Sequence, residues 1–185
     1  MKQPQDFKVQ GPSPILRMIL LRYGAIFVLT IVLLSSCRVN YLFTGGDVGD
    51  ARTITVEQFE GRAPLSTPNS VRIFSEELRT LLLAQTPLKL KQEEGDVQYS
   101  GAITGFDVQP VSIQANETAA LNRLTITVSV TYINTLDTKL NAEFSVSRFA
   151  DYDSSQDLIS VEQQLVADIS KQLAQDIFER TLGNW

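Results

Sequence analysis

Histidine is absent from the 185 residues of the chain, and cysteine occurs only once. Without histidine the chain has no Ser-His-Asp or Cys-His catalytic arrangement and no imidazole metal ligand. With a single cysteine it has no intramolecular disulfide and no cysteine-cluster zinc site. The sequence therefore excludes several common classes of enzyme and metalloprotein before any motif is considered.

Charge is distributed unevenly along the chain. The total is −5, but residues 1–36 contain four basic side chains and one acidic side chain, which gives this segment +3. The rest of the chain therefore carries −8, the difference between these two values. An acidic remainder argues against a nucleic-acid partner and against a general polyanion-binding surface.

An apolar run follows the basic residues near the start of the chain. Residues 23–34 read YGAIFVLTIVLL, and this dozen falls short of the roughly 20 residues that a membrane-spanning helix needs. Basic residues followed by a short apolar run are typical of a secretory signal. We predict that residues 1–36 are a lipoprotein signal peptide, with a plain N-terminal membrane anchor as the alternative.

The only cysteine lies directly after this run. Leu34-Ser35-Ser36-Cys37 closes the run with a branched residue and two small ones, and resembles a bacterial lipobox. Cys37 would then carry acyl chains, and two or more such chains give stable membrane anchoring. The alternative is a cysteine that is buried as a small apolar side chain. Arg38-Val39-Asn40 follows Cys37, so neither an Asp next to the cysteine nor an acidic run is present there. By the sorting pattern of bacterial lipoproteins, we expect the periplasmic side of the outer membrane.

The rest of the sequence predicts a single α+β domain at 52–185, preceded by a flexible tether at 37–51 that is rich in Gly and Asp. Runs of β-branched residues and apolar–polar alternation predict strands, whereas apolar residues spaced three or four apart predict helices. The expected elements are a strand at 52–59, a helix at 67–85, strands at 97–113, 124–132 and 140–149, and a helix at 158–182.

This β-α-β-β-β-α order predicts a two-layer sandwich of two helices on a four-stranded sheet that is mixed but mostly antiparallel. The strand at 124–132 alternates most clearly, with Leu, Ile, Val and Tyr on one face and Thr and Ser on the other. Gly101 and Gly105 in the preceding strand predict bulges or a close neighbour, and Pro110 predicts an edge position or a strand break. Thr67 is the expected N-cap of the first helix, with Pro68 in its first turn.

Few side chains of this sequence could carry chemistry. Residues 151–157 (DYDSSQD) contain three Asp, and their oxygens could bind calcium, but the Gly and terminal Glu of an EF-hand loop are missing. A solvated acidic loop that caps the last helix is the simpler interpretation. No carboxylate spacing points to a glycosidase, and no glycine-rich phosphate loop precedes a helix. We therefore expect no enzyme activity, no cofactor and no metal site.

Basic side chains near strand and loop ends are the candidates for binding an anionic lipid headgroup. They are Arg62, Lys89, Lys91, Arg123 and Arg148. Lys89 and Lys91 are two residues apart and would share a face of a strand, which we expect to begin within residues 88–91. The alternative is that such residues provide solubility or ordinary surface ion pairs.

Several stretches together resemble the LptE family of lipopolysaccharide-assembly lipoproteins. They are the lipobox at Cys37, ITVEQFEGRAPL at 54–65, NETAALNRLTITVSV at 116–130, SRFADYDSS at 147–155 and the terminal LGNW. The resemblance covers nearly all of the chain after Cys37. It implies a lipid-anchored outer-membrane protein of the periplasmic side, with two helices on a four-stranded sheet.

The resemblance also implies a function without a catalytic group. Members of the family insert into the lumen of the LptD β-barrel, help that barrel to fold and contact lipopolysaccharide on its way to the cell surface. A large barrel has a polar interior, so the Thr/Ser face of 124–132 would suit a surface that faces the lumen or a partner. An ordinary solvated sheet face is the alternative for those residues. The alternative function is a stand-alone periplasmic lipoprotein that binds a small apolar or envelope ligand.

Overall fold

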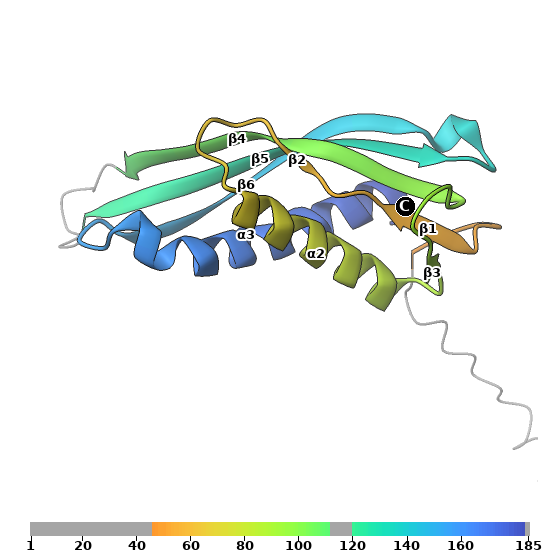
Figure 1. The fold of residues 1–185 in the computed structure, drawn as a ribbon, viewed down its shortest axis with the longest axis horizontal. Coiled ribbons are helices and arrows are strands. Elements are labelled where there is room, and N and C mark those ends of the chain that lie inside the picture. The colour runs from red at the N-terminus through yellow and green to blue at the C-terminus, as the bar shows by residue number, and fades with distance from the viewer. Residues whose placement is uncertain (1–45, 112–119, 184–185) are drawn as a thin grey trace, which may run out of the picture. The chain divides into compact units, whose positions relative to one another are not determined.

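Two helices lie on one face of a mixed β-sheet (Figure 1). The computed structural model describes residues 46–111 and 120–183. The elements are β1 (Thr53–Val56), β2 (Glu60–Gly61), α2 (Pro68–Gln85), β3 (Lys89–Leu90), β4 (Val97–Val111), β5 (Leu121–Asn134), the short 3-10 helix η1 (Thr138–Leu140), β6 (Ala142–Asp153) and α3 (Leu158–Leu182). The predicted α+β fold and the β-α-β-β-β-α order of its main elements are confirmed.

The sheet has the strand order β3-β1-β4-β5-β6, and β2 pairs with β4 beside this path. β1 and β4 are parallel, whereas β5 is antiparallel to both β4 and β6. A parallel pair needs a crossover connection, and α2 lies between these two strands in the chain. The sheet has six strands instead of the expected four because the two-residue strands β2 and β3 add to it. Strands this short leave no alternation in the sequence.

β4 has the irregularities that its sequence predicts. Its register with β5 shifts between Ile103 and Gly105, which marks a bulge. A Cβ atom on Gly101 would collide with the carbonyl oxygen of Ser129 on β5, so the strands approach too closely for any other residue. Pro110 pairs only with Asn122 of β5 among the described residues, so β4 is an edge strand at this point although it is an inner strand nearer its start.

β6 is longer than predicted and ends at Asp153. Residues 151–153 therefore belong to a strand and not to an acidic loop at 151–157. Asp151 stands opposite Arg123 of β5 and pairs with it, which extends the antiparallel ladder to the end of β6. The end of the strand predicted at 97–113 lies outside the described residues.

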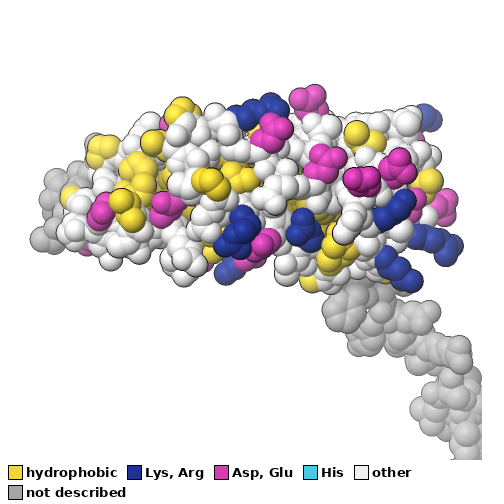
Figure 2. Space-filling model, in the orientation of Figure 1, with side chains coloured by type: hydrophobic (Ala, Val, Ile, Leu, Met, Phe, Trp, Pro, Cys, Tyr) yellow, Lys and Arg dark blue, Asp and Glu magenta, His cyan; other side chains and the backbone are white. Residues whose placement is uncertain are grey.

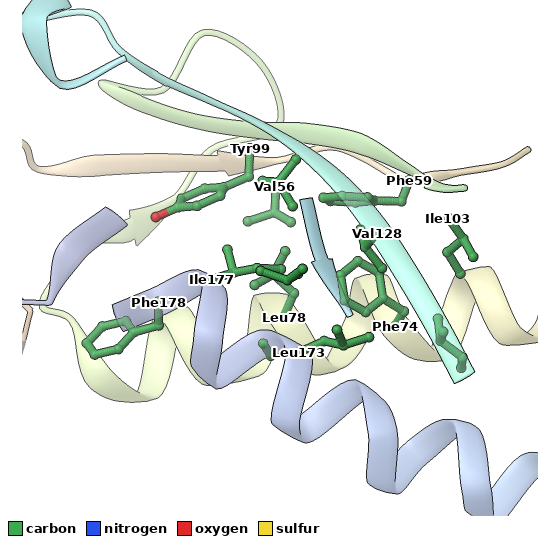
Figure 3. Close-up of a cluster of buried hydrophobic side chains, with 14 of the residues drawn as sticks. Val56, Phe59, Phe74, Leu78, Tyr99, Ile103, Val128, Leu173, Ile177 and Phe178 are labelled. Atoms are coloured by element: carbon green, nitrogen blue, oxygen red, sulfur yellow. The ribbon is translucent and has the colours of Figure 1, made fainter. Parts of the chain in front are cut away.

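The core fills the space between the helices and the sheet. In Figure 3, Leu78 of α2 and Leu173 and Ile177 of α3 point toward Val128 of β5, and all four side chains are fully buried. The apolar stripes of both helices thus face the sheet, as their spacing predicts. The N-terminus of α2 is closed by Thr67, whose hydroxyl oxygen accepts a 3.1 Å hydrogen bond from the N–H of Ser70.

The two helices run side by side in the same direction. Thr67 at the start of α2 donates a hydrogen bond to Glu162 near the start of α3 (3.1 Å), and Gln85 at the end of α2 bonds to Gln175 (3.2 Å). Both helices therefore begin at one end of the domain and finish at the other.

Candidate functional site

The point at which the predicted tether joins the domain lies at the C-terminal end of α3. The N–H of Asp47 donates a hydrogen bond to the carbonyl oxygen of Leu182 (2.8 Å). Cys37, the predicted lipidation site, and the predicted signal at 1–36 lie outside the described residues. Their assignment stays a prediction.

Hydrogen bonds connect three segments at this end of the domain, which we call the tether end: residues 46–53, 89–96 and 134–141. The carboxylate of Asp96 accepts from the N–H groups of Arg52 and Thr53, both at 2.9 Å. These bonds, led by that from Arg52, hold the pKa of Asp96 below its ordinary value. The carbonyl oxygen of Asp96 in turn accepts from the N–H of Thr135 (2.9 Å). The start of β1, directly after the tether, is thus coupled through Asp96 to the turn that joins β5 and β6.

The face of the sheet opposite the helices is rich in hydroxyl groups. On β5 the half-buried Thr and Ser side chains alternate with fully buried apolar ones, as predicted. The serines of β6 stand directly opposite two of them, and Thr127 Oγ1 donates to Ser147 Oγ across the strands at 3.1 Å. We call this surface the hydroxyl face. It consists of Thr125, Thr127, Ser129 and Thr131 of β5 with Ser145 and Ser147 of β6.

Arg123 lies beyond one end of the hydroxyl face, far from the tether end. Its guanidinium donates two hydrogen bonds to the carboxylate of Asp151, at 2.7 and 2.8 Å, and lies 3.7 Å from the centre of the Phe149 ring. The bond from Arg123 lowers the pKa of Asp151, and the carboxylate raises the pKa of Arg123. Phe149 is an exposed aromatic residue. The cluster therefore joins a cation to an accessible apolar ring.

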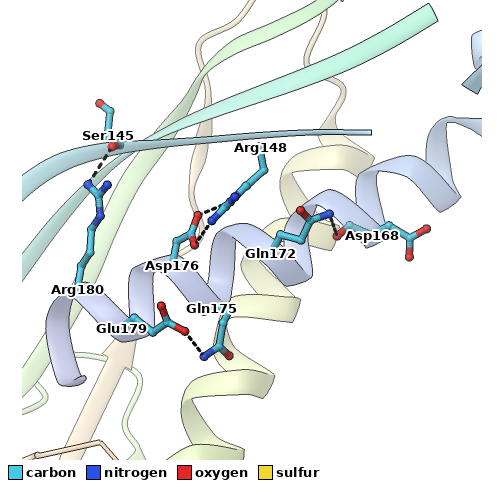
Figure 4. A network of polar contacts seen from close by, with 8 residues as sticks. All are labelled: Ser145, Arg148, Asp168, Gln172, Gln175, Asp176, Glu179 and Arg180. Carbon is cyan, nitrogen blue, oxygen red and sulfur yellow. Dashed lines mark hydrogen bonds and ion pairs between the residues drawn. The ribbon is translucent and has the colours of Figure 1, made fainter. Parts of the chain in front are cut away.

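Arg148 lies on the other face of β6, toward α3. It donates two hydrogen bonds of 2.6 Å to the carboxylate of Asp176 on that helix (Figure 4). Closer to the C-terminal end of α3, Arg180 donates a second contact to β6, a 3.3 Å hydrogen bond to the carbonyl oxygen of Ser145. Arg148 therefore connects α3 to the edge strand β6 through an ion pair. The sequence contained no signal for Asp176, because it lies off the apolar stripe among other polar residues of α3.

The remaining predicted basic residues lie elsewhere. Arg62, directly after β2, pairs with Glu60 at 2.9 Å, and Lys91 donates to the carbonyl oxygen of Glu94 at 2.8 Å. Lys89 is exposed on β3 at the tether end. The structure thus places the five candidates at four separate positions and does not bring them together. On the face shown in Figure 2, basic and acidic side chains are interspersed.

The three acidic residues considered for calcium do not converge on one point. Asp151 is paired with Arg123, and Asp153 accepts hydrogen bonds from the hydroxyl and the N–H of Ser155 at 2.6 and 2.8 Å. The hydroxyl bond is the main cause of the lowered pKa of Asp153. Within 46–111 and 120–183, no group of three or more His, Cys, Asp or Glu side chains could hold a metal ion.

Neither α2 nor α3, the two α-helices of the described ranges, combines the length and apolar character needed to cross a bilayer. Their interface with the sheet is filled by packed side chains (Figure 3). This packing gives no support to a small-ligand site between the two layers.

Comparison with known proteins identifies a family. The family model LptE, described as lipopolysaccharide-assembly, matches residues 51–181. Curated protein sequences give no significant match.

Solved structures of three bacterial lipoproteins are among those similar to the chain. A minor lipoprotein from Acinetobacter baumannii is 14% identical with a TM-score of 0.46, and the match covers 70% of this chain and 91% of that one. Lipoprotein B from Nitrosomonas europaea is 14% identical with a TM-score of 0.43, covering 69% and 79%. Rare lipoprotein B from Shewanella oneidensis is 15% identical with a TM-score of 0.39, covering 66% and 92%. The family assignment rests on the model match over 51–181.

Proposed function

The chain belongs to the LptE family of lipopolysaccharide-assembly proteins, and we propose that it is a lipid-anchored, non-enzymatic subunit of the outer-membrane lipopolysaccharide translocon. In this role it occupies the lumen of an LptD-like β-barrel, assists the assembly of that barrel and helps to deliver lipopolysaccharide to the cell surface. The family match carries the proposal, because residues 51–181 include all six strands and nearly all of both helices.

The hydroxyl face supports the role of a barrel plug. A large outer-membrane barrel has a polar interior, so a plug needs polar groups that bond without requiring a fixed opposite charge. Hydroxyl groups both donate and accept hydrogen bonds. The β-branched Thr side chains of β5 are also stiff, so little conformational entropy is lost when they are covered. A rigid, uncharged strip of this kind suits a lumen wall.

Arg123 is the candidate with the chemistry that a lipopolysaccharide contact needs. A guanidinium has five N–H donors, of which Asp151 takes two, so others remain for an anionic headgroup. Phe149 beside it offers an exposed apolar surface. Arg62, Lys89 and Lys91 remain secondary candidates, and we assign Arg148 to the attachment of α3 in the first place.

Lipidation of Cys37 would place the domain on the periplasmic side of the outer membrane. Labelling cells with radioactive palmitate tests this directly, because the chain has only one cysteine. We expect the label on the wild type and none on Cys37→Ser. Label retained by Cys37→Ser would contradict lipidation at this residue.

The partner is tested by affinity purification of the tagged chain from detergent-solubilised membranes. We expect a large outer-membrane β-barrel to co-purify, and we expect depletion of the chain to lower both the amount of that barrel and surface lipopolysaccharide. Recovery of soluble partners alone, with barrel levels unchanged after depletion, would contradict the proposal.

A further inference from the structure

Two exposed leucines lie at the tether end, on the turn that joins β5 and β6. Leu136 is 56% exposed and Leu140 is 54% exposed, and both border a surface cavity of about 380 Å³. Apolar side chains that gather in one exposed place mark an interaction surface, whereas single ones need no explanation.

The turn that carries these leucines is held firmly by hydrogen bonds. The side-chain oxygen of the buried Asn134 accepts from the N–H groups of Leu136 and Asp137, both at 2.9 Å. The N–H of Asn134 donates to the side-chain oxygen of Asn141 on the other side of the turn (2.8 Å). The fold therefore presents the leucines outward on a satisfied backbone.

The length of the tether limits how far this turn can lie from the lipid anchor. Nine residue steps separate Cys37 from Gly46, and an extended chain spans at most about 3.6 Å per residue, so the reach is about 30 Å. Asp47, which follows directly, borders the same cavity as Leu136 and Leu140. A membrane that holds acyl chains on Cys37 is thus within reach of both leucines.

The opposite end of the domain gives the contrast. Ile159 at the start of α3 is 81% exposed, but α3 has 25 residues, a length of about 37 Å at 1.5 Å per residue. Because the far end of α3 binds Asp47, Ile159 lies at the other end of the domain from the tether. Leu136 and Leu140 are therefore the apolar side chains to test, and Ile159 is an exposed apolar control at the far end.

We propose that Leu136 and Leu140 insert into the phospholipid surface that holds the Cys37 anchor, so that the turn is a second membrane contact. This inference rests on the lipidation of Cys37 in the proposed function. A lipid anchor alone limits the distance of the domain from the membrane and does not set its orientation. A second contact directs the tether end toward the lipid and the Arg123 end away from it. The turn carries one basic and one acidic side chain, Lys139 and Asp137, so the contact depends on apolar burial and little on salt.

The test uses the full-length lipidated protein in vesicles of phosphatidylethanolamine and phosphatidylglycerol. An environment-sensitive fluorophore is attached at Thr138→Cys, an exposed position between the leucines, or at Gln156→Cys, an exposed position at the far end. We expect nitroxide-labelled lipids to quench the probe at 138 and not the probe at 156. The double variant Leu136→Ser, Leu140→Ser should lower the quenching about fivefold or more, because insertion is favoured by moving the exposed half of each leucine side chain out of water. Ile159→Ser should leave the quenching unchanged.

Two other outcomes would contradict the proposal, and they separate a failure of the membrane contact from a failure of the lipid anchor. Absence of quenching at 138 on lipidated protein, or equal quenching at 138 and 156, would refute the membrane contact and leave the proposed translocon role intact. A fluorophore that reacts with protein lacking an introduced cysteine would show that the Cys37 thiol is free. That result would overturn the lipid anchor and the second contact together.

Discussion

Arg123 and Asp151 face each other across β5 and β6 as a register pair, and two hydrogen bonds of 2.7 and 2.8 Å join them. The pair extends β6 and at the same time orients the guanidinium over Phe149. Asp151 thus competes with any anionic ligand for Arg123. The residue that we propose as the lipopolysaccharide contact is therefore partly neutralised by the Asp opposite it on β6.

Removing this competition should strengthen lipopolysaccharide binding. We expect Asp151→Asn to raise the affinity for lipopolysaccharide about threefold to fivefold, and Arg123→Gln to lower it by a similar factor, since exposed ion pairs are worth up to about 1 kcal/mol. Arg72→Gln serves as the control, because Arg72 pairs with Glu76 on α2 and is not among the five candidates. Surface plasmon resonance with immobilised lipopolysaccharide measures the three affinities. Equal affinities for all variants would exclude a direct role for Arg123.

Arg148 should matter for the attachment of α3. Its two hydrogen bonds to Asp176 connect the edge strand to the helix, so Arg148→Gln should lower the thermal midpoint of unfolding. Arg72→Gln is the matched control, because Arg72 pairs with Glu76 within a single helix. Scanning calorimetry should show the larger loss for Arg148→Gln. Equal losses in the two variants would mean that the Arg148–Asp176 pair does not hold the layers together.

Leu78 in the middle of α2 should be a main contributor to stability. It is fully buried among residues of α3 and the sheet, so Leu78→Ala should reduce the free energy of unfolding by about 2 to 5 kcal/mol. Leu140→Ala, which truncates an exposed leucine, should change it by less than about 0.5 kcal/mol. Urea denaturation measures both. Comparable effects of the two substitutions would contradict the assigned core.

Asp96 should make stability depend on acidic pH. Its pKa in the folded protein lies below the ordinary value of 3.8, chiefly because of the hydrogen bond from the N–H of Arg52. A group with a lowered pKa stabilises the fold above its unfolded value, and this stabilisation is lost as the pH falls through the folded value. We therefore expect Asp96→Asn to be less stable than the wild type at neutral pH, and the difference to shrink below about pH 4. Thermal unfolding from pH 7 to pH 2.5 checks this, and a difference that stays constant would be incompatible with the assignment.

The sequence predicts those elements whose signal is local. The alternation of β5 follows from the side-chain period of a strand. The start of α2 follows from Thr67 as N-cap and Pro68 in the first turn, which act without contacts from other segments. β2 could not be predicted in this way, because its two residues join the sheet only through the longer strand β4 beside it. The strand expected at Lys89 and Lys91 corresponds to β3, but only Lys89 and Leu90 pair with β1.

The candidate site was predictable in part for the same reason. The β5 part of the hydroxyl face follows from alternation along that strand, whereas the addition of Ser145 and Ser147 depends on the pairing of β6 with β5. The positions of the basic residues depend on tertiary pairing, since Arg123 and Arg148 lie on opposite faces of the sheet and Asp176 reaches Arg148 from α3. The five predicted ligand-binding residues are therefore dispersed over the domain, although the local sequence around each of them favours a basic side chain at a strand or loop end.

Photocrosslinking from the hydroxyl face in living cells tests the proposed role as a barrel plug most directly. A photoreactive amino acid at Thr127, in the middle of β5 and half-buried, lies on the surface that we assign to the lumen wall. Irradiation should give one dominant adduct with a large outer-membrane β-barrel, which disappears without irradiation and when the barrel is depleted. Adducts formed only with soluble periplasmic proteins, while the barrel is present at its normal level, would contradict the account.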